Sequence, residues 1–195
     1  MSRPVNVRRP EELCEAIAQY LIEHGLSGLS LRPLAKAIGS SPRGLLYHFG
    51  SKEKMVMAAI AEIRRRQRMS LDSIERPTLA ETYEAVWKQL SSPHSETQFR
   101  FFFEVYGIAL RRPRLYHEFL HETVEDWLQL IAEPLVKAGA KPQDARAFAS
   151  VVLASLRGFM LDLCNTRDRQ RIDRAVALWA TSLDAMLPGR KVEEV

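Results

Sequence analysis

Several features that would set this chain apart from ordinary globular proteins are scarce or missing. Its 195 residues include two cysteines, Cys14 and Cys164, too few for a disulfide framework or a four-cysteine zinc site. The longest run without a charged side chain, residues 147–156, falls well short of the roughly 20 residues that span a bilayer. No apolar block follows the N-terminal arginines, so no secretory signal is indicated. We therefore expect a reduced cytoplasmic protein with no membrane partner.

The sequence also lacks the strict alternation of apolar and polar residues that predicts a β-strand. Apolar residues instead recur with the 3.6-residue period of a helix. We expect an all-α protein with about nine helices, at residues 11–24, 31–38, 42–49, 51–69, 79–90, 95–111, 114–138, 143–164 and 168–187. The expected N-caps are Ser30, Ser41 and Ser51, with a capping box at Thr78 and Glu81. Three prolines are expected between helices: Pro93, Pro113 and Pro142.

Positive charge is concentrated in the first third of the chain. Residues 1–69 hold 12 Lys/Arg against 6 Glu, while the other 126 residues hold 16 against 18 Asp/Glu. A basic N-terminal part joined to a near-neutral body is typical of a nucleic-acid-binding protein with a separate regulatory part. Basic residues that merely solvate helix faces would give the same count. Arg3, Arg8 and Arg9 form either a flexible arm for a DNA minor groove or a disordered polar tail.

Residues 30–52 have the pattern of two short helices that cross at a tight turn. Ala35 is small enough for a close crossing, and Gly39 tolerates the positive φ that the turn needs. The second helix begins at Pro42 with small and polar residues, which allow close approach to base edges. Arg43 is long enough to reach a guanine edge. This pattern predicts a helix-turn-helix that binds DNA, and a helical hairpin with a solvated polar end is the alternative.

The segment 30–54, above all residues 45–54, closely resembles the tetracycline-repressor-like (TetR) family of transcriptional regulators. The resemblance implies a homodimer that binds an operator and represses until a small ligand enters its C-terminal domain. It places Arg43 and Gly44 on the recognition helix. Two positions depart from the usual family pattern, because Leu46 stands where tyrosine is usual and Ser40 where valine is common.

We expect residues 1–54 to form the DNA-binding domain, with an arm at 1–10, and residues 55–190 to bind the ligand and to dimerise. The expected partners are a double-stranded DNA operator with an inverted repeat, an apolar or aromatic effector and a second copy of the chain. No cofactor, bound metal or enzymatic activity is expected. The expected DNA contacts are Arg32, Ser41, Arg43, Gly44, Tyr47, His48 and Lys52. The resemblance implies that the last three of these contact phosphates.

The helix expected at 143–164 is apolar on nearly every side, so it must be enclosed in its own domain or against another subunit. The last helix, 168–187, carries apolar residues at core spacing. Together the two helices predict a four-helix dimer interface, with burial inside one subunit as the alternative. The expected interface residues are Val152, Leu156, Phe159, Leu163, Leu178, Trp179 and Leu183.

An aromatic cluster at residues 99–106 covers more than one face of its helix. With other aromatic side chains it predicts an apolar cavity that holds a few polar anchors, Glu104 among them, although such a stripe is more often plain core. The expected ligand-binding residues are Trp87, Phe103, Tyr106, His121, Trp127 and Phe159.

Residues 117–121 match the H-E-x-x-H pattern of zinc peptidases. On a helix, His117 and His121 would share one face, and Glu118 would supply a general base. A peptidase or a helical metal-binding protein is therefore the alternative function. We expect a coincidence, since the sequence indicates neither a third ligand nor an edge strand.

Overall fold

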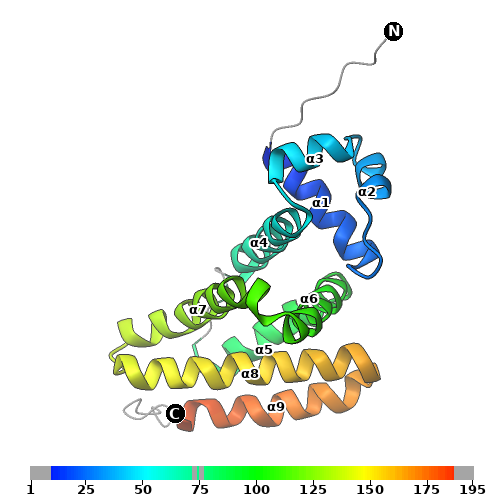
Figure 1. Cartoon of the computed structure of the whole chain (residues 1–195). Coiled ribbons are helices and arrows are strands. Elements are labelled where there is room, and N and C mark those ends of the chain that lie inside the picture. Colours follow the sequence, from blue (N-terminus) through cyan, green and yellow to red (C-terminus); the bar gives the residue numbers. More distant parts are fainter. Residues whose placement is uncertain (1–9, 72–73, 75–76, 187–195) are drawn as a thin grey trace. The chain divides into compact units, whose positions relative to one another are not determined.

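The computed structural model describes residues 10–71, 74 and 77–186, except for the side chains of Pro10, Leu115, Glu118 and Phe119. Arg3, Arg8 and Arg9 of the expected arm lie outside the described residues. Over the described part the chain forms nine α-helices and no strand, which confirms the predicted fold class (Figure 1). The helices are α1 (Pro10–His24), α2 (Leu31–Ala37), α3 (Pro42–Phe49), α4 (Lys52–Leu71), α5 (Leu79–Leu90), α6 (Pro93–Arg111), α7 (Pro113–Lys137), α8 (Pro142–Thr166) and α9 (Arg169–Met186).

Side-chain caps begin several of these helices where the sequence predicts them. The hydroxyls of Ser41 and Ser51 accept hydrogen bonds from backbone N–H groups three residues on, at 3.0 and 3.1 Å. Thr78 and Glu81 form the complete capping box ahead of α5. Ser30 is the N-cap residue of α2 as expected, but its hydroxyl makes no capping hydrogen bond.

Prolines stand at the start of α6, α7 and α8, and not between helices as expected. Pro93, Pro113 and Pro142 are the first residues of these helices. The first helical N–H has no partner within the helix, and the fixed φ of proline suits this position. The three helices therefore begin one or two residues earlier than the periodicity of their apolar residues indicates.

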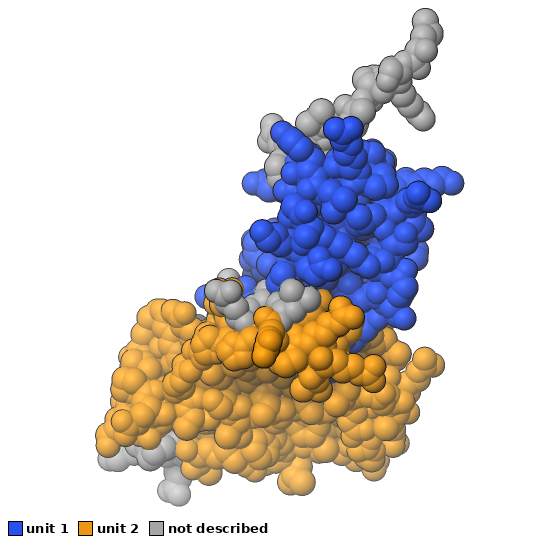
Figure 2. Space-filling model, in the orientation of Figure 1, with its two compact units in different colours: residues 1–72, 101–106 blue, residues 73–100, 107–195 orange. Residues whose placement is uncertain are grey.

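Contacts between residues divide the chain into two compact units, drawn in different colours in Figure 2. The N-terminal unit comprises residues 1–72 with residues 101–106, and the C-terminal unit comprises residues 73–100 with residues 107–195. The first division between these compact units falls after α4, which packs along α1. Residues of α6 belong to both units, its middle to the first and its two ends to the second.

The N-terminal unit is a small helical domain with its own core. Helices α1 and α4 pack along each other, and α3 packs against both α2 and α4. Ala35 is buried on α2, as a close helix crossing requires. The fully buried side chains of these four helices include Ile17, Leu21, Leu34, Leu45 and Ile60.

The C-terminal unit is built around α8. Helix α7 packs along α8, α5 packs against α9, and α8 and α9 lie side by side in opposite directions (Figure 1). Arg167, in the left-handed conformation with a φ of 58°, ends α8 and turns the chain into α9. Helix α8 extends on both sides of the uncharged run at residues 147–156. By length and composition alone, it is long and apolar enough to cross a membrane. Its apolar side chains Phe148, Leu156 and Met160 are buried within the unit.

Candidate nucleic-acid interface

Helices α2 and α3 are joined by the tight turn that the sequence predicts. Gly39 adopts a φ of +69°, in the left-handed region that glycine enters without a steric cost. The backbone N–H of Ser40 donates to the carbonyl of Ala35 at 2.8 Å and closes the turn. The start of α3 is thereby placed directly after the end of α2.

Helix α3 has one face toward the core and one toward solvent. Leu45 is buried, whereas Arg43, Leu46 and Tyr47 are exposed at positions i, i+3 and i+4, which share one side of a helix. Tyr47 is 85% exposed. This solvent-facing side carries a long cation, a leucine and a phenol, so it can contact both base edges and a backbone.

The other predicted DNA-binding residues of α2 and α3 fall into two kinds. Arg32 and His48 are exposed, and the His48 ring meets the Tyr47 ring edge-on at 5.6 Å. The Ser41 hydroxyl accepts from the backbone of Gly44, and a Cβ at Gly44 would lie 3.1 Å from that oxygen. Ser41 and Gly44 therefore form the compact start of α3.

Lys52, the predicted phosphate contact at the start of α4, has an internal partner. Its ammonium group donates a hydrogen bond to the carbonyl of Leu29, in the segment that precedes α2. An ammonium group has three donors, so this bond leaves others for a phosphate. Lys52 thus connects the start of α4 to the entry of α2.

Part of the positive charge of the N-terminal unit is compensated within it. Arg65 and Arg66 bind the carboxylate of Glu62 at 2.7–2.9 Å, and Arg66 also pairs with Glu15 of α1 at 2.7 Å. Hydrogen bonds from Arg65 and then Arg66 outweigh the desolvation of Glu62 and lower its pKa to about 2. These arginines of α4 are therefore engaged in ion pairs, within α4 for Arg65 and both within α4 and to α1 for Arg66.

Glu104 does not serve as a pocket anchor in this structure. Its carboxylate accepts hydrogen bonds from the backbone N–H groups of Leu26 and Ser27, at 2.9 and 2.7 Å. These partners lie 78 and 77 residues earlier in the chain. No local sequence pattern marks such a pair, which is why sequence reasoning missed it.

The predicted aromatic pocket is only partly assembled. Trp87 is buried, meets the Phe159 ring edge-on at 6.1 Å and donates its indole N–H to Asp173 at 2.8 Å. Trp127 packs elsewhere, against a cluster of Leu128, Ala149 and Leu153. His121 is exposed. Phe103 and Tyr106 belong to the N-terminal unit.

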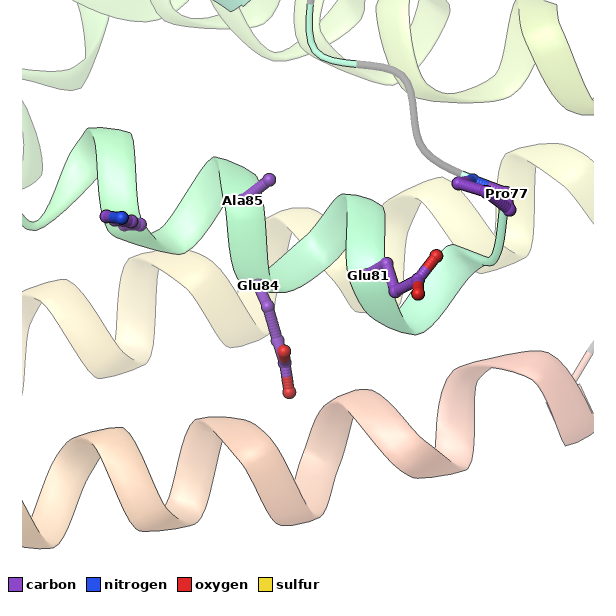
Figure 3. A pocket seen from close by; sticks show the side chains of 5 residues that line it. Pro77, Glu81, Glu84 and Ala85 are labelled. Atoms are coloured by element: carbon purple, nitrogen blue, oxygen red, sulfur yellow. The ribbon is translucent and has the colours of Figure 1, made fainter.

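A depression of about 410 Å³ lies along α5, and Figure 3 shows the side chains that line it. It is lined by Pro77, Glu81, Glu84, Ala85 and Lys88, which come from α5 and the residues just before it. The depression is open and carries two carboxylates and an ammonium group. It therefore differs in place and chemistry from the apolar cavity that the aromatic residues predict.

Most of the predicted interface residues serve the core of their own subunit. Trp179 donates its indole N–H to the Ser155 hydroxyl at 3.0 Å, and Tyr83 shares that hydroxyl at 2.9 Å. Burial raises the pKa of Tyr83 to about 12. Leu178, in contrast, is 74% exposed. Four of the predicted residues are buried: Val152, Leu156, Leu163 and Leu183.

No metal centre is found among the described residues, since no three His, Cys, Asp or Glu side chains lie together there. His117 and His121 are exposed, with ring centroids 6.3 Å apart, and the side chain of Glu118 lies outside the described residues. Burial raises the pKa of the thiols of Cys14 and Cys164, which disfavours their thiolate forms.

A small helical domain with a tight glycine turn and a second helix that exposes an arginine and a tyrosine is a helix-turn-helix domain. Residues 13–59 match the family described as "Bacterial regulatory proteins, tetR family". A curated relative, the HTH-type transcriptional repressor AcnR of Corynebacterium efficiens, is 38% identical over 60 residues. That match spans 31% of this chain and 31% of the relative.

Two solved structures share the fold over nearly the whole chain. A transcriptional regulator from Rhodococcus sp. Rha1 has a TM-score of 0.76 and 22% identity, and the match covers 94% of this chain and 100% of that one. The multidrug binding protein EbrR, complexed with imidazole, has a TM-score of 0.66 and 21% identity, with 97% and 100% covered. The helix-turn-helix segment of this chain is therefore similar to the tetR family, and the chain as a whole has the fold of these two solved proteins.

Proposed function

We propose that this protein is a ligand-responsive transcriptional repressor that binds an inverted-repeat operator as a homodimer. The observation that carries the proposal is the exposed face of α3, with Arg43 and Tyr47, within the segment that matches the tetR family. Repression, as opposed to activation, is supported by the relative AcnR, which is named a transcriptional repressor.

In the proposed complex, α3 lies in the major groove with its N-terminal end toward the bases. Arg43 donates two hydrogen bonds to the O6 and N7 of a guanine. Tyr47, His48 and Arg32 bind phosphates and fix the register, with the remaining donors of Lys52 beside them. The small residues Ser41 and Gly44 at the start of α3 allow this end of the helix to approach the base edges closely.

The dimer surface that we propose is the solvent-facing side of α8 and α9. Along α8 the exposed positions repeat every three or four residues, as a helix-packing stripe requires. Gly158 and Ala154 allow close approach of a second helix, and Leu178 of α9 supplies a large apolar contact. The exposed stripe of α8 consists of Ala147, Val151, Ala154, Gly158 and Leu161.

The C-terminal unit is the proposed effector-binding part, and the structure of EbrR with imidazole supports a small-molecule site on this fold. The rings of the buried Trp87 and the partly exposed Phe159 are the proposed aromatic wall. A ligand releases the operator only if it binds the non-DNA-binding conformation more tightly, because equal affinity for both conformations shifts no equilibrium.

Selection of bound fragments from a random DNA pool tests the function directly. We expect the enriched fragments to share an inverted repeat whose half-sites lie one helical turn apart, and to be retarded in mobility-shift assays against a scrambled duplex. A pool that stays random after repeated selection at low salt would refute the proposal.

A further inference from the structure

The carboxylate of Glu104 holds the connection between α1 and α2. Its two oxygens accept separate hydrogen bonds from consecutive amides, Leu26 at 2.9 Å and Ser27 at 2.7 Å. Hydrogen bonds to an ionised acceptor are roughly twice as strong as neutral ones. The Glu104 side chain is half-buried, so solvent competes only in part for these amides.

The backbone of this connection is shaped to accept an anion at close range. Gly25 has a φ of +72°, and a Cβ at this position would lie 2.9 Å from a Glu104 oxygen. Successive N–H groups that converge after a left-handed residue form a concave anion site. Glycine at position 25 therefore permits both the turn and the approach of the carboxylate.

The same connection is held from its other side by α4. The Leu29 amide donates to the carbonyl of Leu26 at 3.1 Å, and the Leu29 carbonyl accepts from the ammonium group of Lys52. Residues 25–29 thus lie between a carboxylate of α6 and a cation at the start of α4. Ser30, the next residue, is the N-cap position of α2, so this segment determines where α2 begins.

We propose that Glu104 is a positioning residue for DNA binding, which holds residues 25–29 and thereby α2 and α3 in the DNA-binding arrangement. The inference rests on the proposed function. Residues 101–106 of α6 are grouped with the N-terminal unit, while both ends of this continuous helix are grouped with the C-terminal unit. Glu104 lies in the stretch of α6 that is grouped with the N-terminal unit, and its carboxylate binds the segment before the helix-turn-helix.

The test compares Glu104→Ala and Glu104→Gln with the wild-type full-length protein. We expect operator affinity to fall roughly tenfold in Glu104→Ala, as for the loss of a charge-assisted hydrogen bond, and less in Glu104→Gln, which keeps one acceptor oxygen. The slope of affinity against salt and the preferred sequence are expected to stay unchanged, because no phosphate or base contact is removed. Fluorescence anisotropy on the selected duplex measures all three.

Amide hydrogen exchange gives a readout at the proposed contact itself. In Glu104→Ala we expect faster exchange at Leu26 and Ser27, with the thermal transition still cooperative. The matched control is Glu96→Ala on the same helix, whose carboxylate pairs with Arg100 at 2.8 Å. This control is expected to change neither exchange at residues 26 and 27 nor operator affinity.

Two results would overturn the inference. One is faster exchange at Leu26 and Ser27 with unchanged operator affinity, which would make Glu104 a structural contact only. The other is an equal loss of affinity in Glu104→Ala and Glu96→Ala, which would indicate general destabilisation. A wild-type protein that binds no duplex would instead refute the proposed function, an outcome that is recognised before any variant is compared.

Discussion

At the scale of single residues, Arg43 and Arg32 allow base recognition to be distinguished from binding of the DNA backbone. Both guanidinium groups are exposed, but Arg43 lies in the first turn of α3 and Arg32 in the first turn of α2. In a helix-turn-helix the N-terminal end of the second helix meets base edges, whereas the first helix crosses the backbone. The two residues therefore have different expected effects on specificity.

Arg43→Ala is expected to relax the preference for one base pair in each half-site. Loss of a bidentate guanine contact lowers discrimination against the wrong base by about 1–3 kcal/mol. Competition mobility shifts with single-base operator variants measure this discrimination. Full retention of the preference in Arg43→Ala would exclude this residue from base recognition.

Arg32→Ala serves as the matched comparison for Arg43→Ala. A lost phosphate contact weakens binding to all sequences alike and lowers the salt slope by about one for each contact removed. We expect this uniform effect, with unchanged base preference, in the same titrations. A variant with altered preference and an unaltered salt slope would reverse the assignment.

At the scale of elements, α4 carries a cluster of ion pairs around Glu62 that extends to α1 through one further pair, Arg66 with Glu15. Arg65 and Arg66 donate to the Glu62 carboxylate, and Arg66 extends to Glu15 on α1. The pKa of Glu62 is lowered from 4.5 to about 2 by these hydrogen bonds. A carboxylate with a lowered pKa stabilises the folded state above its unfolded pKa, and the contribution is lost as pH falls toward the folded value.

We therefore expect Glu62→Gln to be less stable than the wild type at pH 7. The difference should shrink as pH falls from about 5 toward 2, because the wild-type carboxylate then becomes protonated. Urea unfolding at a series of pH values measures the difference. Glu84→Gln, on the exposed side of α5, is the control for removal of a surface carboxylate. A pH-independent difference in Glu62→Gln would contradict the assigned ion pairs.

Helices and caps were largely predictable from sequence, because their signals lie within a few residues of one another. The helix-turn-helix followed from Ala35, Gly39 and Pro42 at fixed offsets. The position of Glu104 was not predictable, because its partners are nearly 80 residues away. Apolar content alone also does not tell which side of α8 faces the core, since that helix has apolar residues on several sides.

The two sides of α8 illustrate the same limit. Val152 and its neighbour Val151 are chemically identical, yet the first is buried and the second is exposed. The difference arises because the helices packed against α8, α7 and α9 among them, cover some of its positions and leave others exposed. Periodicity gives the pattern of a face, but only the packing partners decide its direction.

At the scale of the whole molecule, the proposed dimer would allow both half-sites of an inverted-repeat operator to be bound at once. Each subunit carries one copy of α3, so a single subunit contacts one half-site only. Linking two half-site contacts raises affinity by roughly 10²- to 10⁴-fold without any new contact to DNA. A substitution that disrupts the proposed α8–α9 surface should therefore also lower operator affinity.

Leu178→Arg is expected to yield a monomer, because it places a charge within the proposed α8–α9 surface. Sedimentation velocity measures the oligomeric state, and operator affinity should fall roughly 10²- to 10⁴-fold while half-site binding persists. Leu110→Arg is the matched control, since Leu110 is an equally large leucine of the C-terminal unit and is 84% exposed. The control should remain dimeric with unchanged operator affinity. The two substitutions add the same charge to an exposed leucine and differ only in position. If Leu178→Arg were dimeric and Leu110→Arg monomeric, the interface would instead lie at the end of α6.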